Sequence, residues 1–116
     1  MQVVRNEEAI TRKMGEGTLH KVLSYDDNLM VCELTFEAGA TGKEHSHPHT
    51  QITYVISGEH SFIIDGETTV LKAGDSIYIP SGAMHNAACI KPLALSRVRL
   101  LIFFPPSGTT LCYKFR

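Results

Sequence analysis

The sequence predicts an all-β domain, either a sandwich or a barrel. Short stretches of alternating polar and apolar residues are separated by Gly, Pro, Asn and Asp turns about every 8–12 residues, which is typical of these folds. No segment shows a sustained apolar period of about 3.6 residues, as an amphipathic helix would. Asp65 and Gly66 stand between two such stretches and form the strongest hairpin signal in the chain.

Length, charge and cysteine content predict the general class of protein. The 116 residues predict one domain, residues 1–116, because single domains commonly have about 100–150 residues. A hydrophobic content of 43% and a net charge of -1 argue against disorder and against a nucleic-acid partner. No apolar run approaches the roughly 18 residues of a membrane span, so we expect no membrane partner. The widely spaced Cys32, Cys89 and Cys112 fit buried, reduced thiols in a cytoplasmic protein.

The N-terminal part of the chain predicts an arm followed by two strands. Residues 1–14 are polar and mixed, and we expect an arm or an edge strand there. A Gly-Glu-Gly turn precedes a loosely alternating strand at 18–23, and an Asp- and Asn-rich turn follows it. Clear alternation predicts a half-buried strand at 29–37. Its apolar face consists of Met30, Cys32, Leu34 and Phe36.

The central part predicts a strand whose two faces differ in chemistry, and then a series of shorter strands. In residues 51–57, Gln51 lies on the face opposite Ile52 and Tyr54, and we expect it to point toward the interior. The Asp65-Gly66 turn joins the next two strands into a hairpin. We expect the remaining strands at residues 61–64, 67–71, 76–79 and 84–90.

Histidines gather just before the central strand and predict a metal site. His45 and His47 are two residues apart, so on an extended chain their imidazoles share one face, and Gln51 follows closely. His85 follows a second strand that is bounded by Gly and Pro. Two or three imidazoles with one oxygen donor suit a divalent transition metal, Zn, Ni, Mn, Fe or Cu. We therefore expect one such ion, held by His45, His47, Gln51 and His85.

The other histidines and two tyrosines are weaker candidates. His49 follows a proline, and we expect it at a turn rather than in the site. We expect His20 and His60 at the surface. Tyr54 and Tyr78 fit the core and a pocket equally well.

Both histidine-bearing stretches resemble the two sequence motifs of the cupin superfamily. The residues that match the first motif are His45, His47, Gln51 and Gly58, with Gln in place of the usual Glu. Those that match the second are Gly74, Pro80, Gly82 and His85, with Cys89 where the family has Asn. Within the cupins, residues 15–95 resemble the small pectin-degradation proteins of the KdgF family. The residues that carry this second resemblance are 25–30, 45–49, 51–55 and 73–80.

The resemblance implies a fold and an activity. It implies a single-domain jelly-roll barrel, or double-stranded β-helix, that forms a homodimer by pairing outer strands. It also implies a small sugar acid as substrate: 4,5-unsaturated uronates from pectin or alginate breakdown, converted into linear 5-keto-4-deoxyuronates. Two alternatives stay open, a small metal-dependent cupin of the dioxygenase type and a non-catalytic cupin that binds sugar or metal.

The C-terminal residues 96–116 depart from the resembled family, whose last strand carries Asp-x-Phe followed by Pro. With suitably chosen codons, a shift of one base after Leu95 restores that pattern, so we interpret this tail as frameshifted, with ordinary divergence as the alternative. In this interpretation Ile102 stands where the family has Asp, and Phe104 keeps the aromatic, a possible pocket residue. Because isoleucine cannot transfer protons, we expect turnover slower by at least about a hundredfold than in a frame-restored chain.

Overall fold

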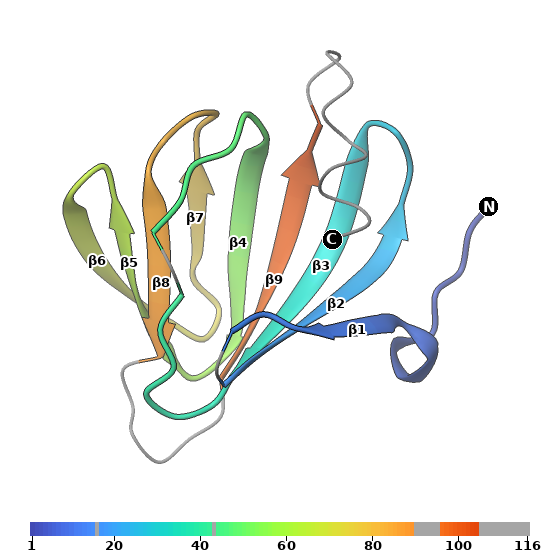
Figure 1. Ribbon diagram of the computed structural model, residues 1–116, viewed down its shortest axis with the longest axis horizontal. Helices are drawn as coiled ribbons and strands as arrows, with labels where there is room; N and C mark the ends of the chain where they lie inside the picture. The colour runs from blue at the N-terminus through green and yellow to red at the C-terminus, as the bar shows by residue number, and fades with distance from the viewer. Residues whose placement is uncertain (16, 43, 90–95, 105–116) are drawn as a thin grey trace.

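The structure is a computed structural model that describes residues 1–15, 17–42, 44–89 and 96–104 (Figure 1). Within these ranges there is no α-helix, and no helix is long and apolar enough to cross a membrane. One 3-10 turn, η1 (Asn6–Glu8), precedes the strands. The strands are β1 (Ile10–Lys13), β2 (Thr18–Tyr25), β3 (Leu29–Phe36), β4 (Thr50–Ser57), β5 (Glu59–Ile64), β6 (Glu67–Lys72), β7 (Ser76–Ile79), β8 (His85–Cys89) and β9 (Ser96–Phe103).

The strands form two antiparallel sheets, which confirms the predicted all-β jelly roll. The larger sheet has the order β1-β2-β3-β9-β4-β7, and the smaller has the order β6-β5-β8. Isolated bridges from Thr41 to Ala88 and from His45 to His85 tie the segment between β3 and β4 to β8. Figure 1 shows this segment running along β8, with the small sheet on one side of the molecule and β1 to β3 on the other. The residues that later form the site therefore come together from both sheets.

The last described strand, β9, lies in the middle of the larger sheet, between β3 and β4. Its burial alternates, so that Val98, Leu100 and Ile102 face the core while Arg97 and Arg99 face outward. On the outer face, Arg99 Nε lies 3.6 Å from a carboxylate oxygen of Glu33 on β3. Alternation of this kind lets the atypical sequence after Leu95 form a well-packed strand.

Two turns depend on backbone conformations that few residues adopt. The hairpin between β5 and β6 pairs Ile64 with Glu67, and both turn residues have positive φ, 47° for Asp65 and 83° for Gly66. This is the two-residue turn predicted from the sequence. Gly58, between β4 and β5, has a φ of 82°, and a Cβ there would lie 2.3 Å from the Cβ of Ser96. Only glycine fits where the chain passes β9 so closely.

Most sequence-based expectations about the strands are confirmed, with shifts of a few residues at the ends. Residues 1–14 contain both η1 and the edge strand β1, and Cys32 and Cys89 are buried and unbridged. Cys112 lies outside the described residues. The expectation that His20 and His60 are at the surface was wrong, because their side chains are 5% and 0% exposed.

The two tyrosines lie neither in the core nor in the pocket. Tyr54 on β4 and Tyr78 on β7 are 47% and 61% exposed, on the outer face of the larger sheet. Gln51 and Thr53, by contrast, are buried on the inner face of β4, as the alternation predicted.

Candidate metal centre

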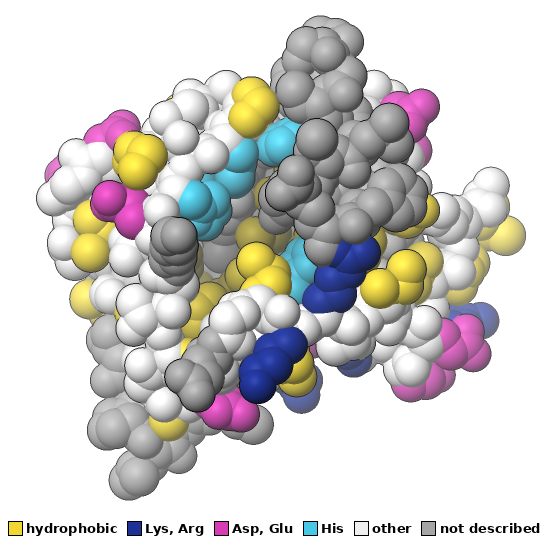
Figure 2. All heavy atoms as spheres, in the orientation of Figure 1, with side chains coloured by type: hydrophobic (Ala, Val, Ile, Leu, Met, Phe, Trp, Pro, Cys, Tyr) yellow, Lys and Arg dark blue, Asp and Glu magenta, His cyan; other side chains and the backbone are white. Residues whose placement is uncertain are grey.

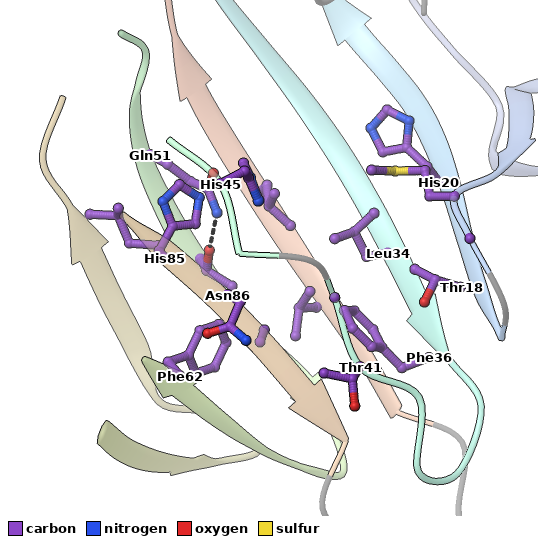
Figure 3. A pocket seen from close by; sticks show the side chains of 18 residues that line it. Thr18, His20, Leu34, Phe36, Thr41, His45, Gln51, Phe62, His85 and Asn86 are labelled. Carbon is purple, nitrogen blue, oxygen red and sulfur yellow. Dashed lines mark hydrogen bonds between the residues drawn. The ribbon is translucent and has the colours of Figure 1, made fainter. Parts of the chain in front are cut away.

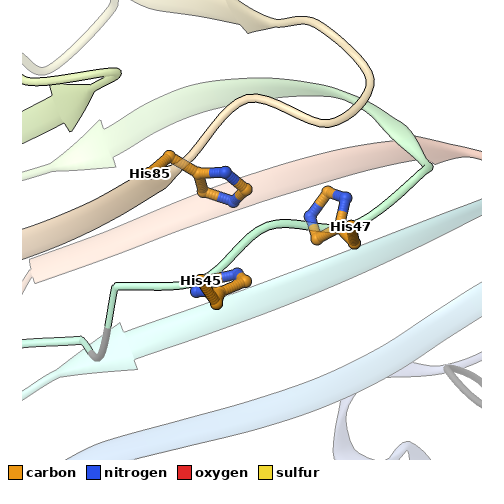
Figure 4. Close-up of side chains that lie close together, drawn as sticks. All are labelled: His45, His47 and His85. Carbon is orange, nitrogen blue, oxygen red and sulfur yellow. The ribbon is translucent and has the colours of Figure 1, made fainter.

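Three of the four predicted ligands form a compact cluster (Figure 4). His45 and His85 exchange backbone hydrogen bonds of 3.0 and 2.8 Å, which fix the segment before β4 against the start of β8. The imidazole centroids of His45 and His47 lie 4.3 and 4.8 Å, respectively, from that of His85. The candidate ligand nitrogens of the three rings all lie within 4.8 Å of one another. Three side chains from two segments distant in sequence could thus hold one metal ion.

Backbone carbonyls orient two of these rings. His85 Nδ1 donates to the carbonyl oxygen of Ala83 at 2.9 Å, and His47 Nδ1 donates to that of His49 at 2.9 Å. A carbonyl oxygen can only accept, so in each neutral ring the hydrogen is on Nδ1 and the lone pair is on Nε2. Nε2 of His85 is buried and has no hydrogen-bond partner. This is the arrangement in which metal-binding histidines are usually held.

Gln51 completes the cluster with an oxygen. Its Oε1 lies 3.2 Å from Nε2 of His47, and its Nε2 donates to Oγ1 of Thr53 at 2.8 Å (dashed line in Figure 3). In this orientation the amide oxygen, not the amide nitrogen, faces His47. Two acceptors therefore face each other, which is unfavourable unless a cation lies between them. Metal–ligand bonds of about 2.1 Å place neighbouring ligand atoms about 3.0–3.4 Å apart, so the observed separation fits a shared metal ion.

Burial also keeps the cluster in the protonation state that binds metals. The pKa of His47 and the pKa of His85 are both lowered, chiefly because burial penalises the charged imidazolium. In the opposite direction, the Gln51 oxygen and a backbone carbonyl favour the charged form of His47, and the Ala83 carbonyl favours that of His85, but these effects are weaker than burial. At neutral pH both rings are neutral, which is the form that coordinates a metal ion.

The cluster stands at one end of a cavity of about 590 Å³ between the two sheets (Figure 3). His45, Gln51 and His85 belong to its wall. The wall is mostly apolar, and the described residues on it include no carboxylate, ammonium or guanidinium group. The apolar side chains are those of Met14, Leu34, Phe36, Phe62, Ile79, Ala87, Val98 and Leu100. The polar ones outside the cluster are those of Thr18, His20, Thr41, Thr53 and Asn86.

The remaining candidates are close to the cluster without belonging to it. His49 is 4% exposed, and its ring meets that of Phe104 edge-on at a centroid distance of 5.0 Å. Its contribution to the cluster is the carbonyl that holds His47. Phe104 is 7% exposed, and neither it nor Ile102 is part of the cavity wall. Ile102 is fully buried and pairs with Gln51 across the β4–β9 ladder.

Sequence reasoning missed His20, Thr53 and Asn86. Two of them, Thr53 and His20, had a signal in the alternation of the strands. Thr53 shares a face with Gln51, and His20 shares one with Thr18, a buried residue two positions earlier. Asn86 directly follows His85 and has a buried Oδ1 without a hydrogen-bond partner. Its amide could accept a hydrogen bond from a bound hydroxyl group.

Comparison with known proteins gives one consistent picture. The sequence profile of the cupin domain matches residues 32–103. The pectin degradation protein KdgF of Dickeya dadantii is 32% identical over 87 residues, which cover 74% of this chain and 79% of that protein. The structure of KdgF from Halomonas sp. has a TM-score of 0.81 at 29% identity, covering 92% of this chain and 96% of that one. An RmlC-like cupin from Shewanella frigidimarina has a TM-score of 0.82 at 28% identity, covering 92% and 94%.

Proposed function

The chain belongs to the cupin family, and from this premise we propose that it is a metal-dependent enzyme acting on 4,5-unsaturated uronates. In this proposal the uronates come from pectin or alginate breakdown and leave as linear 5-keto-4-deoxyuronates. The observation that carries the proposal is the cluster of His45, His47, Gln51 and His85 at the end of a ligand-sized cavity. The similarity to two KdgF proteins, one named for pectin degradation, supports the substrate class.

Each residue of the cluster has a distinct task in this proposal. The three imidazoles and the Gln51 oxygen would hold one divalent transition metal, which would supply a Lewis acid for a substrate oxygen. Gln51 is neutral, so it leaves more positive charge at the site than a glutamate would. Thr53 fixes the orientation of the amide, and Asn86 accepts a hydrogen bond from a sugar hydroxyl. The apolar wall keeps bulk water from the reacting end.

We expect this chain to catalyse the proton-transfer step poorly. Conversion of an enol into a ketone needs a group that moves a proton, and Ile102 stands where the resembled family has Asp. Ile102 is next to Gln51 across the β4–β9 ladder, so a carboxylate there would lie beside the metal ligands. General acid–base groups typically contribute about 10²–10⁴-fold in rate. We therefore propose that this chain turns over slowly, because residues 96–116 are frameshifted or have diverged.

Ultraviolet absorbance tests the activity directly. Ring opening and ketonisation destroy the conjugated chromophore of an unsaturated uronate, so turnover appears as loss of absorbance. We expect slow loss with the metal-loaded chain and at least a hundredfold faster loss with Ile102→Asp and with a frame-restored chain, at equal metal content. No loss with any of the three would refute the activity. Equal rates would refute the role of this position and the interpretation of the tail as damaged.

One observation favours a second candidate function, a non-catalytic cupin that binds sugar acids. No carboxylate is present on the described part of the cavity wall, and Ile102 cannot act as an acid or base. A chain that binds uronates, fails to turn them over, and stays inactive as Ile102→Asp would fit this candidate.

The same proposal includes a homodimer in the cytoplasm. The edge strand β1 exposes its outer backbone edge, and pairing of such edges between copies removes an aggregation risk. We expect light scattering at micromolar concentration to give the mass of a dimer, and a monomer mass would contradict this part of the proposal.

A further inference from the structure

The cavity is larger and more apolar than a single uronate requires. Its volume of about 590 Å³ falls in the range of about 300–1,000 Å³ that is typical of sites for drug-sized molecules. A uronate opens to a linear keto acid only from a free anomeric carbon, so the substrate of the proposed function is a single sugar ring. Most carbons of that ring carry a hydroxyl or carboxylate group, and each such group needs a hydrogen-bond partner when it is buried. The wall beyond the histidine cluster offers few such partners.

An apolar strip leads away from the cluster across the inner face of the larger sheet. Thr53 on β4 pairs with Leu100 of β9. Two residues before Leu100, Val98 pairs with Leu34 of β3, and Phe36 continues the strip along β3. All five residues belong to the cavity wall, and Figure 3 shows Leu34 and Phe36 on the side away from His85. Because neighbouring strands lie about 4.8 Å apart, the strip extends at least about 10 Å from Thr53 to Leu34.

The charge of the site sets a second requirement on the ligand. All four donors of the cluster are neutral when they hold a metal ion, because an imidazole must be unprotonated to coordinate. The described part of the wall adds no carboxylate, so a divalent ion there would keep its full charge in a mostly apolar cavity. Such a charge is costly to bury unless a ligand brings a negative group. His20, beyond the strip, adds no charge at neutral pH, because burial and the charge of Arg12 lower its pKa. The site therefore suits one anionic head group and an uncharged body.

We propose that the cavity binds monocarboxylic acids with an apolar body, with the carboxylate at the histidine cluster and the body along the apolar strip of Leu100, Val98, Leu34 and Phe36. The position of the head group rests on the metal site of the proposed function. Figure 2 shows histidines along the margin of the hollow and apolar side chains inside it, so both parts of the site open to the same face. A straight-chain fatty acid such as octanoate has this chemistry. It shares the cluster with the uronate, so the two ligands compete.

A series of straight-chain acids tests the proposal without catalysis. We would titrate zinc-loaded protein calorimetrically with butyrate, hexanoate and octanoate, and with galacturonate as the polar acid. Burial of one CH₂ group contributes about fourfold in affinity, so we expect affinity to rise by at least about tenfold from each acid to the next. Octanoate should also bind more tightly than galacturonate, whose hydroxyl groups find few partners on the strip. Equal affinities for butyrate and octanoate would overturn the proposal.

Two leucines of the larger sheet provide a matched pair of variants. Leu34 is half-buried on the cavity wall, whereas Leu101 is half-buried on the outer face, between Val31 and Ile52. Leu34→Asn should weaken octanoate binding by about tenfold or more and leave butyrate nearly unchanged, because only the longer acid reaches the strip. Leu101→Asn should bind both acids as the wild type does. Equal losses in the two variants would show general association with apolar surface and would overturn the proposal. Leu34→Ala, which adds no polar group, gives the same test if Leu34→Asn does not fold.

The position of the head group has its own test. The double variant His45→Ala, His47→Ala should bind octanoate at least about tenfold more weakly than the wild type, because the carboxylate loses its cationic partner. Unchanged binding of octanoate would show that the carboxylate lies elsewhere and would overturn the proposal.

The outcome is separable from that of the proposed function, which absorbance decides. Turnover of an unsaturated uronate with no dependence on acid chain length would overturn the fatty-acid site and leave the activity standing. Dependence on chain length that Leu34→Asn removes, without any turnover, would support the fatty-acid site and refute the activity. Where both are found, octanoate should raise the apparent KM for the uronate without changing kcat. An unchanged KM would overturn the shared position of the two carboxylates.

Discussion

His85 and His60 are both almost completely buried, yet only His85 is built into a polar site. Nδ1 of His85 donates to the carbonyl of Ala83, and its ring lies 4.3 and 4.8 Å from those of His45 and His47. His60 is 0% exposed and lies between aromatic rings, with Phe36 edge-on at 5.1 Å and Phe62 tilted at 5.9 Å. Neither of its ring nitrogens has a hydrogen-bond partner.

The difference shows that burial alone does not identify a candidate metal ligand. A ligand needs a neighbour that fixes its tautomer and further donors that point to the same place. His85 has both, and Gln51 with its bond to Thr53 adds a fourth donor. His60 has neither, and burial lowers its pKa to about 4, so it behaves as a neutral, flat side chain of the core.

The largest expected effect is on metal content, which should depend on His45 and His47 but not on His60. Purified protein should carry about one transition-metal ion per chain, and the double variant His45→Ala, His47→Ala should carry none, because two of the four donors are gone. His60→Leu should keep the full metal content. Elemental analysis measures all three. A double variant that keeps its metal would contradict the assignment of the site, and loss of metal from His60→Leu would contradict the comparison.

The second effect concerns stability and pH. The folded protein binds a proton at His60 only near pH 4, whereas an unfolded chain does so near its ordinary pKa of 6.5. Stability should therefore fall as the pH drops from about 6.5 to about 4, by on the order of 3 kcal/mol from His60 alone. Above this window His60 contributes no pH dependence. Urea unfolding at pH 7 and pH 4.5 should show a smaller loss in His60→Leu than in the wild type. Identical losses would mean that His60 is not the group that resists protonation.

The third and smallest effect is on metal affinity, and it tests whether the hydrogen bond between Gln51 and Thr53 supports the metal site. Thr53→Val removes the acceptor that orients Gln51, so the amide is free to turn its nitrogen toward His47. Loss of such a supporting group typically lowers metal affinity about 10–100-fold, and we expect the lower end because Gln51 is one of four donors. Thr50→Val, on the opposite face of β4, is the control and should bind metal normally. Competition with a chelating dye measures the affinities, and equal affinities in both variants would show that Thr53 does not hold the site.

Local pattern was sufficient to predict much of the fold and the cluster. Alternation in β4 placed Gln51 on the inner face, and the Asp65-Gly66 dipeptide predicted its hairpin with the correct register. The spacing of His45 and His47 predicted one shared face, because these are properties of neighbouring residues. The geometry also brings His85 to them, as its position in the second histidine-bearing stretch suggested.

The features that could not be predicted, the burial of two histidines and the cavity wall, depend on the order of strands in the sheets. His20 was expected at the surface because the alternation of its strand is ambiguous, with exposed Leu19 next to it. His60 shares a face with Phe62, but only packing of β3 against β5 shows that this face is covered, by Phe36. The apolar wall between His20 and the histidine cluster exists because β9 lies between β3 and β4, which no short-range pattern reveals.

The central position of β9 also bears on how the chain folds as it is synthesised. β3 and β4 are not bonded to each other; each pairs with β9, whose residues leave the ribosome long after theirs. Until then each of the two strands has an open backbone edge, and such edges recruit other chains. Contacts between segments this distant in sequence also form slowly. Yield in cells is therefore expected to depend on chaperones that cover β3 and β4 until residues 96–103 arrive.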